Sequence, residues 1–258
     1  MPQTAKKHFD EDMARAKVLL AHAVPLPHGR ASTKLLRNDI FRSSWMYAVG
    51  ALDAYFCDAY ADLVARILKA KSIQNNLRLT EAIENILFPV GAIFAETNIR
   101  ENWKWRLAAR DLIEKDNMVS INKIQKLFNP FLRNGHKLFE ASVIDDWIKN
   151  KRAPQRLVAI SKTNFAVLAG NLLDGARKTA RKKIVARYGE ILQRRHDCIH
   201  NCDRPKLSLQ SISQTSTEKS LADVSFLVEY CDKHFESEFN HYLHTIGANA
   251  QTRNRAGY

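Results

Sequence analysis

The segment Leu36–Lys71 reads LRNDIFRSSWMYAVGALDAYFCDAYADLVARILKAK, and its pattern predicts one long helix. Apolar side chains recur along it at steps of three, four or seven residues, which places them on one face of a helix. A continuous apolar face of this length indicates a helix at the centre of a hydrophobic core. The face consists of Phe41, Trp45, Ala48, Leu52, Phe56, Leu63 and Ile67.

The composition of the chain agrees with a helical fold. Of its 258 residues only nine are glycine and seven are proline, and 45% are hydrophobic. Alanine, leucine, lysine and arginine, which favour helices, are abundant. A chain of this length and hydrophobic content can bury a substantial core. We therefore expect an all-α fold, with residues 1–258 in a single helical domain.

Two more long helices are expected in the second half of the chain. The first runs from about Asn171 to His196, and the second runs to about Thr245 from a start at which Thr215 and Glu218 resemble a capping box. The apolar face of the first consists of Leu173, Ala176, Ala180, Ile184, Tyr188 and Ile191, and that of the second of Leu221, Val224, Val228, Cys231, Phe235 and Phe239.

The remaining segments show shorter patterns. Residues 1–35 are expected to form an N-terminal arm with one short helix over residues 10–24. Residues 72–170 are expected to form an inserted or elaborated helical region, and residues 246–258 a flexible basic tail. The helices expected within 72–170 are Leu77–Leu87, Trp103–Ile113 and Ile121–Phe128, the last with Ser120 as its N-cap.

A second side of the Leu36–Lys71 helix mixes polar and apolar residues. One interpretation is a solvated or subunit-facing surface with an ion pair between Asp39 and Arg42. The other places Arg42 and Asp53 beside a functional site formed elsewhere in the chain. The residues on this side are Asp39, Arg42, Met46, Asp53, Cys57 and Tyr60.

The net charge points to a polyanionic partner. The chain has 40 Lys and Arg against 27 Asp and Glu, a formal charge of +13 at pH 7, so binding to a polyanion would release counterions. Nucleic acid is favoured over a membrane, because no apolar run approaches the roughly 20 residues of a spanning helix. The first residues do not lead into a signal-peptide core, and four cysteines are few for a disulfide framework. We expect a cytoplasmic protein with reduced thiols.

The helix that begins near Asn171 leads into the motif Arg-His-Asp-Cys-Ile-His at residues 195–200. Arg195 lies four residues after Ile191, within about 40° of the apolar face of a helix, so its guanidinium is expected to point inward or toward another subunit. A buried ion pair is the structural explanation of such a position. The candidate partners are Asp39, Asp53 and Asp197.

The other side of the same helix carries a run of basic residues. In most proteins such a run is a solvated face. Here it precedes the motif by roughly 20 Å of helix, and together with the net charge it is a candidate track for phosphates. The run consists of Arg177, Lys178, Arg181, Lys182 and Lys183.

Three chemistries compete for the motif. Zinc binding by His196, His200, Cys198 and Cys202 is disfavoured, because on a helix the two histidines share a face while the cysteines point elsewhere. A nucleophilic cysteine is disfavoured, because no nucleophile elbow or oxyanion loop surrounds Cys198 or Cys202. Cleavage of RNA would use an arginine for the phosphate and a histidine for proton transfer, with no bound metal or other cofactor. Only this chemistry also accounts for the net charge.

The motif resembles the signature of HEPN domains, the helical domains named for higher eukaryotes and prokaryotes nucleotide-binding. The resemblance is specific over residues 188–206, and it extends loosely to the helices at 36–71 and 215–245, where Arg42 and Asp53 fit the pattern. It is nearest to the RiboL-PSP and related stand-alone branches, and it does not cover the middle of the chain. It implies an up-and-down helical bundle with an inserted region, which dimerises so that two motifs meet in one composite cleft.

The resemblance also implies roles for individual residues. Arg195 takes the position of the motif arginine and His200 that of the motif histidine, while His196 takes the polar position that helps to orient the site. Arg194 is an alternative register for the arginine, one residue longer. The other supporting residues are Arg42, Asp53 and Asp197.

Active HEPN proteins are metal-independent endoribonucleases that leave 2′,3′-cyclic phosphate ends, and many serve as toxins or in phage defence. The resemblance therefore implies an endoribonuclease that acts on RNA as a homodimer, with an antitoxin or regulatory protein as a further candidate partner. Other HEPN bundles only bind nucleotides or proteins. The alternative is a non-catalytic module that binds nucleic acid or a partner protein through its basic face.

Overall fold

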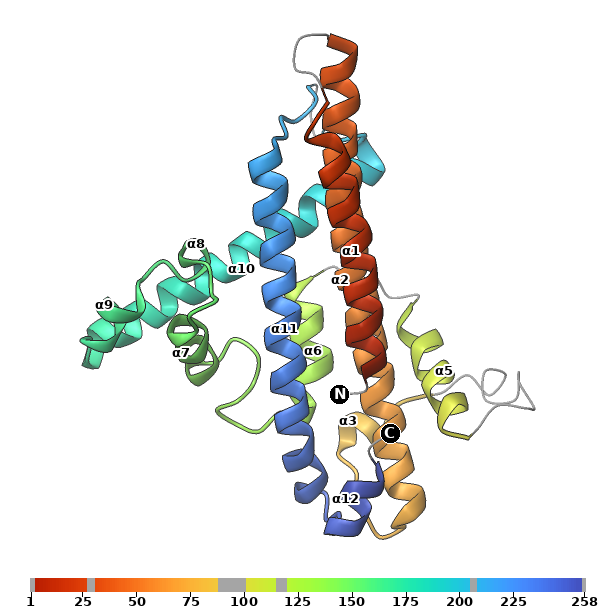
Figure 1. Ribbon diagram of the computed structural model, residues 1–258. Coiled ribbons are helices and arrows are strands. Elements are labelled where there is room, and N and C mark those ends of the chain that lie inside the picture. Colours follow the sequence, from red (N-terminus) through yellow and green to blue (C-terminus); the bar gives the residue numbers. More distant parts are fainter. Residues whose placement is uncertain (1–2, 27–30, 88–100, 115–119, 205–207, 257–258) are drawn as a thin grey trace. The chain divides into compact units, whose positions relative to one another are not determined.

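The computed structural model describes residues 3–26, 31–87, 101–114, 120–204 and 208–256. All regular secondary structure in these ranges is helical, which confirms the all-α prediction (Figure 1). The long helices are α1 (Gln3–Ala23), α2 (Ala31–Ile73), α10 (Gly170–Asn201) and α11 (Gln214–Thr245). The shorter ones are α3 (Glu81–Glu84), α5 (Glu101–Glu114), α6 (Ile121–Phe128), α7 (Ala141–Lys149), α8 (Gln155–Val158), α9 (Lys162–Ala166) and α12 (Ala250–Ala256), with a 3₁₀ turn at Asn129–Phe131.

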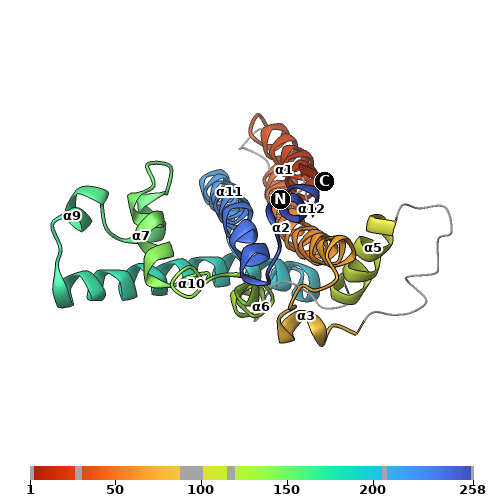
Figure 2. The same ribbon diagram turned by 90° about the horizontal axis from the view of Figure 1, so that it is seen from below.

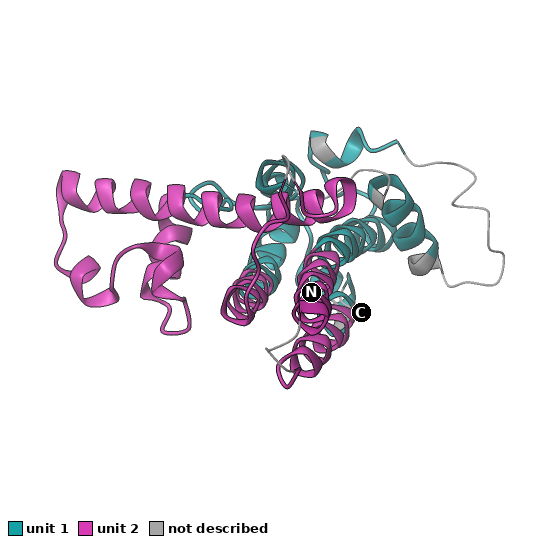
Figure 3. Cartoon of the chain, turned by 90° about the horizontal axis from the view of Figure 1, so that it is seen from above, with its two compact units in different colours: residues 1–7, 53–140, 230–258 teal, residues 8–52, 141–229 magenta. Residues whose placement is uncertain are grey.

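The chain divides into two compact units (Figure 3). Unit 1 comprises Met1–Lys7, Asp53–Glu140 and Tyr230–Tyr258, and unit 2 comprises His8–Leu52 and Ala141–Glu229. Helices α1, α2 and α11 each contribute residues to both units. The segment 72–170 coincides with neither unit, because its residues through Glu140 belong to unit 1 and the rest to unit 2.

Helix α2 confirms the long helix predicted from its apolar face, and every member of that face is buried. The interpretation of its second side as solvated holds for Asp39, whose side chain is 56% exposed. It is wrong for Arg42, Cys57 and Tyr60, which are each 7% exposed or less. The predicted ion pair between Arg42 and Asp39 does form, at 3.0 Å.

Aromatic rings pack the core of unit 1. Phe128 of α6 stacks on Phe235 of α11 with ring centroids 4.4 Å apart, and it meets Phe56 of α2 edge-on at 5.7 Å. Helix α6 begins as predicted, because Ser120 Oγ accepts a hydrogen bond from the backbone N–H of Lys123 at 3.1 Å. The cap and the stacked rings together fix α6 against the two longer helices.

The segment 246–258, predicted to be a flexible tail, contains helix α12. Thr252 and Ala256 of this helix are buried. Gln74 anchors the start of the segment, since its amide nitrogen donates to the Gly247 carbonyl at 2.9 Å and its amide oxygen accepts from the Asn249 N–H at 3.0 Å. A helix this short and polar leaves no apolar periodicity in the sequence.

A buried ion-pair group joins α2 to α5 in unit 1. The Arg106 guanidinium donates to Asp62 at 2.5 Å and to Asp58 at 3.0 Å, and Arg110 also binds Asp58. Burial raises the pKa of Asp62 to about 6, although the nearby Arg106 acts to lower it. Asp62 therefore titrates between the acidic and the neutral range.

Because folding raises this pKa, the contribution of Asp62 to stability is fully present below its unfolded value and is lost as the pH rises through about 6. We expect the side-chain carboxyl carbon of Asp62 to titrate by NMR with a midpoint of about 6. Arg106→Met should raise the midpoint further, because it removes the main charge that favours the carboxylate. A wild-type midpoint of about 4, as in an exposed carboxyl, would contradict the role given to burial.

In unit 2, α1 and the first half of α2 lie side by side (Figures 1 and 2), and Ser44 Oγ donates to the Ala16 carbonyl at 2.7 Å. Helices α7 and α8 pack against α10 (Figure 1). Trp147 of α7 lies edge-on to Tyr188 of α10 and to Phe226 of α11, with centroid separations of 6.4 and 5.0 Å. The first part of α10 is thus fixed by apolar contacts.

Buried Asp223 of α11 adds polar contacts to the same core. Its carboxylate accepts from Arg187 of α10 at 2.9 Å and also binds Arg156 of α8. Its backbone carbonyl accepts from the Tyr188 hydroxyl at 2.8 Å. One residue therefore ties three helices of unit 2 together.

Helix α11 begins with a capping box that differs from the predicted one. Ser213 Oγ accepts from the Ser216 N–H at 3.2 Å, and Ser216 Oγ accepts from the Ser213 N–H at 3.1 Å. The predicted box of Thr215 and Glu218 is wrong, because Glu218 instead accepts from the Gln214 side chain at 2.7 Å. The serine pair satisfies two N-terminal donors reciprocally, as in other capping boxes.

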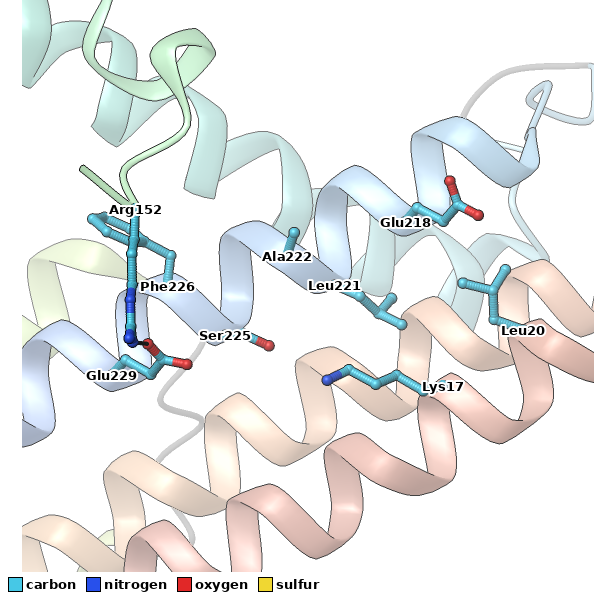
Figure 4. A pocket seen from close by; sticks show the side chains of 9 residues that line it. All are labelled: Lys17, Leu20, Arg152, Glu218, Leu221, Ala222, Ser225, Phe226 and Glu229. Atoms are coloured by element: carbon cyan, nitrogen blue, oxygen red, sulfur yellow. Dashed lines mark ion pairs between the residues drawn. The ribbon is translucent and has the colours of Figure 1, made fainter. Parts of the chain in front are cut away.

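Unit 2 also contains a groove between α1 and α11, with a volume of about 410 Å³ (Figure 4). Leu20, Leu221 and Phe226 give it an apolar lining, and an ion pair between Arg152 and Glu229 at 3.7 Å lies on it. None of the site residues predicted from the sequence lines this groove.

Candidate functional site

The motif at residues 195–200 lies entirely within the last two turns of α10. The helix ends at Cys202, and both Cys202 and Asp203 adopt left-handed backbone conformations, with φ of 47° and 58°. The Cys202 N–H donates to the Asp197 carbonyl, five residues back, and the Asp203 N–H donates to the same carbonyl at 2.9 Å. The chain therefore reverses sharply, and the carboxylate of Asp203 lies against the helix that it has just left.

Asp203 is the centre of a buried ion cluster. Its Oδ2 accepts from Arg42 Nε at 2.6 Å and from Arg194 Nη2 at 2.9 Å, and the residue is 0% exposed. Arg42 also donates to Asp39 at 3.0 Å and to the Gln210 carbonyl at 2.7 Å. One carboxylate thus joins α2 to the end of α10 through two guanidinium groups.

Arg194 is held by further contacts. Its guanidinium lies over the ring of Trp45 at 5.1 Å from the centroid and donates to the Ser211 carbonyl at 3.0 Å. Trp45 Nε1 in turn donates to the Ile191 carbonyl of α10 at 3.2 Å. The indole therefore positions both the helix backbone and the arginine side chain.

Asp197 is buried at the edge of the same cluster. Its two oxygens accept from Gln193 at 2.9 Å and from Gln210 at 3.2 Å. The predicted ion pair between Asp197 and Arg195 is absent from the part of the chain that the structure describes. Asp197 and Gln210 instead fasten the returning chain to α10.

The two arginines of the motif region have different surroundings. Arg194 enters the buried cluster, whereas Arg195 is partly exposed and makes no hydrogen bond or ion pair within the described residues. Arg195 therefore does not lie in the core of its own chain, and the other predicted direction, toward another subunit, stays a prediction. The returning Asp203 and Ser211 cover the face that carries Arg194, and sequence periodicity cannot anticipate this covering. Arg195 is nevertheless the arginine left accessible to a ligand.

His196 and His200 form an exposed pair. Their ring centroids are 4.4 Å apart with the planes tilted by 44°, which confirms that the two histidines share a helix face. At about 100° per residue, Arg195 lies roughly 100° from His196 and roughly 140° from His200 around the helix axis. The guanidinium and the imidazole of the motif therefore point to different sides of α10.

The cysteine and metal alternatives gain no support. Burial and, as the second cause, the neighbouring Asp203 carboxylate raise the pKa of Cys198 to about 11, so the thiol stays protonated at neutral pH. Among the residues placed in the structure, no group of three or more His, Cys, Asp or Glu side chains could hold a metal ion.

The supporting residues predicted from the sequence separate into two sets. Arg42, Arg194 and Asp197 come together at the end of α10, whereas Asp53 belongs to unit 1. Asp203 and Gln210 were missed by the sequence analysis. Both lie outside the helices, where no periodicity marks a residue as buried. The only signal was the polar Asn-Cys-Asp sequence at a helix end.

The basic residues on α10 also differ in their surroundings, because one of them is ion-paired and the others are exposed. Arg177 donates to Asp145 at 2.8 and 2.6 Å and to Asp174 at 3.1 Å, and these carboxylates, Asp145 foremost, raise its pKa. Its charge is thus neutralised within unit 2, contrary to the prediction that it binds phosphate. The other members, Lys178, Arg181, Lys182 and Lys183, are exposed.

Comparison with known proteins gives no match, since no protein-family model, curated protein or solved structure matches the chain. The resemblance to HEPN domains stays a prediction that rests on the motif and its helical setting. Over the residues that the structure covers, no helix is long and apolar enough to cross a membrane.

Removing the central carboxylate should destabilise the fold. In Asp203→Ala, Arg42 and Arg194 lose the partner that they share, and breaking a buried ion pair in this way costs about 3–5 kcal/mol. Asp39→Ala removes a partner of the same Arg42 whose side chain is 56% exposed, and should cost about 1 kcal/mol or less. Urea unfolding of the two variants measures the difference, and equal losses would contradict the cluster as described.

Proposed function

We propose that this protein is a metal-independent endoribonuclease whose reacting groups are Arg195, His196 and His200. The observation that carries the proposal is the exposed histidine pair, together with an arginine that forms no ion pair within the described residues, all on a helix end that a buried ion cluster holds in place. Unpaired cations and imidazoles on a rigid support are suited to phosphate binding and proton transfer. The resemblance to HEPN domains supports the same assignment.

The cleavage step needs only proton transfers. His200 removes the proton of a 2′-hydroxyl, the 2′-oxygen attacks the adjacent phosphorus, and the bond to the 5′-oxygen breaks as that oxygen takes up a proton from water. Arg195 binds the non-bridging oxygens, on which negative charge builds up in the transition state. His196 lies close enough to orient His200. The products are a 2′,3′-cyclic phosphate and a 5′-hydroxyl.

A shared site between two copies is part of the proposal. Within one chain, Arg195 and His200 diverge by roughly 140° around α10, so one phosphate cannot easily contact both from a single side of the helix. A second copy facing the end of α10 would bring its own arginine opposite the first copy's histidine. Ile199, which is 51% exposed within the motif, offers an apolar contact for such a dimer.

The HEPN resemblance extends the proposal to a biological setting. It suggests a cytoplasmic enzyme with a role as a toxin or in phage defence, and an antitoxin or other regulatory protein as a possible partner. The net charge of +13 supports RNA as the polyanion that is bound. If the wild-type protein binds RNA without cutting it, the alternative of a binding module replaces the nuclease.

Removing either motif group should abolish cleavage without unfolding the protein. We expect His200→Ala and Arg195→Ala each to lower the rate of RNA cleavage by about a hundredfold or more, because general acid–base and charge-stabilising groups contribute on that scale. The assay uses purified protein, total RNA and excess EDTA, with end-group analysis for cyclic phosphates. His22→Ala, which changes an exposed histidine on α1, should leave the rate unchanged. Full activity in either motif variant would disprove the assignment.

Mixing the two inactive variants tests the shared site. If each site takes Arg195 from one copy and His200 from the other, a mixed dimer of Arg195→Ala and His200→Ala chains retains one intact site. We expect co-refolded mixtures to recover about a quarter of wild-type activity, since about half of the dimers are mixed and each has one of two sites. If both groups act within one chain, mixing restores nothing.

A further inference from the structure

One line along α10 stays exposed from its third turn to the motif. Its members lie at steps of three, four or seven residues, and at about 100° per residue they fall within roughly 60° of one another. All of them are exposed. We call it the α10 line, and it consists of Lys178, Lys182, Gly189, Gln193, His196 and His200.

The charge on this line is positive and is not neutralised by the same helix. Lys178 and Lys182 form no ion pair within the described residues. The carboxylates of α10 are engaged elsewhere, since Asp174 binds Arg177, Glu190 lies 3.5 Å from Arg187 and Asp197 is buried. The two lysines therefore keep their full charge for a ligand.

Gly189 leaves the backbone open midway along the line. It lies seven residues after Lys182 and seven before His196, and a Cβ added to it would meet nothing within 4 Å. Glycine inside a helix costs about 1 kcal/mol relative to alanine, and no internal contact here requires it. The backbone of α10 is thus uncovered at Gly189, between the lysines and the rest of the line.

We infer that a single-stranded RNA substrate lies along the α10 line, with its phosphates on Lys178 and Lys182 and its scissile phosphate at the histidine pair; this inference rests on the proposed function. Lys182 and His196 are roughly 21 Å apart along the axis, and the whole line covers roughly 33 Å. At about 3.4 Å per stacked nucleotide, this is the length of about ten nucleotides.

The arrangement of charge favours one strand over a duplex. Recognition of double-stranded RNA spans two successive minor grooves, whereas a single ridge of one helix offers one row of cations. The chemistry points the same way, because attack by the 2′-oxygen needs the 5′-oxygen directly opposite, and a stacked A-form duplex does not allow that alignment. Single-stranded substrates supply both the flexible backbone and a single row of phosphates.

Binding is tested with full-length protein and a labelled strand of about twelve 2′-O-methyl nucleotides, which spans the line but cannot be cleaved. Lys178→Ala/Lys182→Ala should weaken binding on the order of tenfold and reduce the slope of log affinity against log salt by about 1.4, the value for two phosphates on a single strand. The control Lys149→Ala/Lys162→Ala removes the same charge from exposed lysines outside α10 and should change the slope little.

Cleavage kinetics separate this surface from the reacting groups. Loss of Lys178 and Lys182 should raise KM for a cleavable strand of the same length and leave kcat unchanged, with no effect on a dinucleotide too short to reach Lys182. Equal losses in the two lysine pairs, or preferred binding of a duplex of the same sequence, would overturn the inference. Absence of cleavage with lysine-dependent binding intact would overturn only the nuclease proposal.

Discussion

The arrangement at the end of α10 depends on one carboxylate, that of Asp203, held between Arg42 and Arg194 away from water. Burying a charge is costly unless it is paired and hydrogen-bonded, so Asp203 can occupy this position only with both guanidinium groups in place. The chain must also reverse through two non-glycine residues with left-handed backbone, a conformation that costs about 1–2 kcal/mol per residue. The ion cluster offsets that strain, and it also fixes the last turns of α10 on α2.

The cluster also decides which cations are available to a ligand. Arginine has a planar fork of donors that suits carboxylates, and the arginines of this chain bind most of its buried acids. Within the described residues, those arginines are Arg42, Arg106, Arg110, Arg133, Arg156, Arg187 and Arg194. The exposed positive charge of α10 is carried largely by lysines, together with Arg181 and Arg195. The net charge of +13 is therefore not spread evenly over the surface, because several arginines are paired with carboxylates inside the fold.

Much of this fold can be predicted from periodicity. The faces of α2, α10 and α11 and the Ser120 cap of α6 all follow from local patterns, because apolar spacing and cap chemistry act within a few turns of one helix. That His196 and His200 share a helix face also follows from their spacing. Local patterns do not predict which side chains are buried where a segment distant in the sequence covers them. Arg194 rather than Arg195 is covered because Asp203 and Ser211 fold back over it, and a segment between helices carries no period that would reveal this.

The continuity of α10 through the motif has a consequence for any chemistry at this site. A helix fixes the angle between its side chains, so Arg195 and His200 cannot be brought to one side without breaking the backbone hydrogen bonds of its last turns. The ion cluster at Asp203 resists such a change, because it holds the same turns in place. A phosphate that contacts both groups must therefore contact Arg195 on one copy of α10 and His200 on another. Two copies of the helix could place Arg195 of one copy opposite His200 of the other without deforming either helix. The rigidity that separates the two groups within one chain would then hold them in place between two chains.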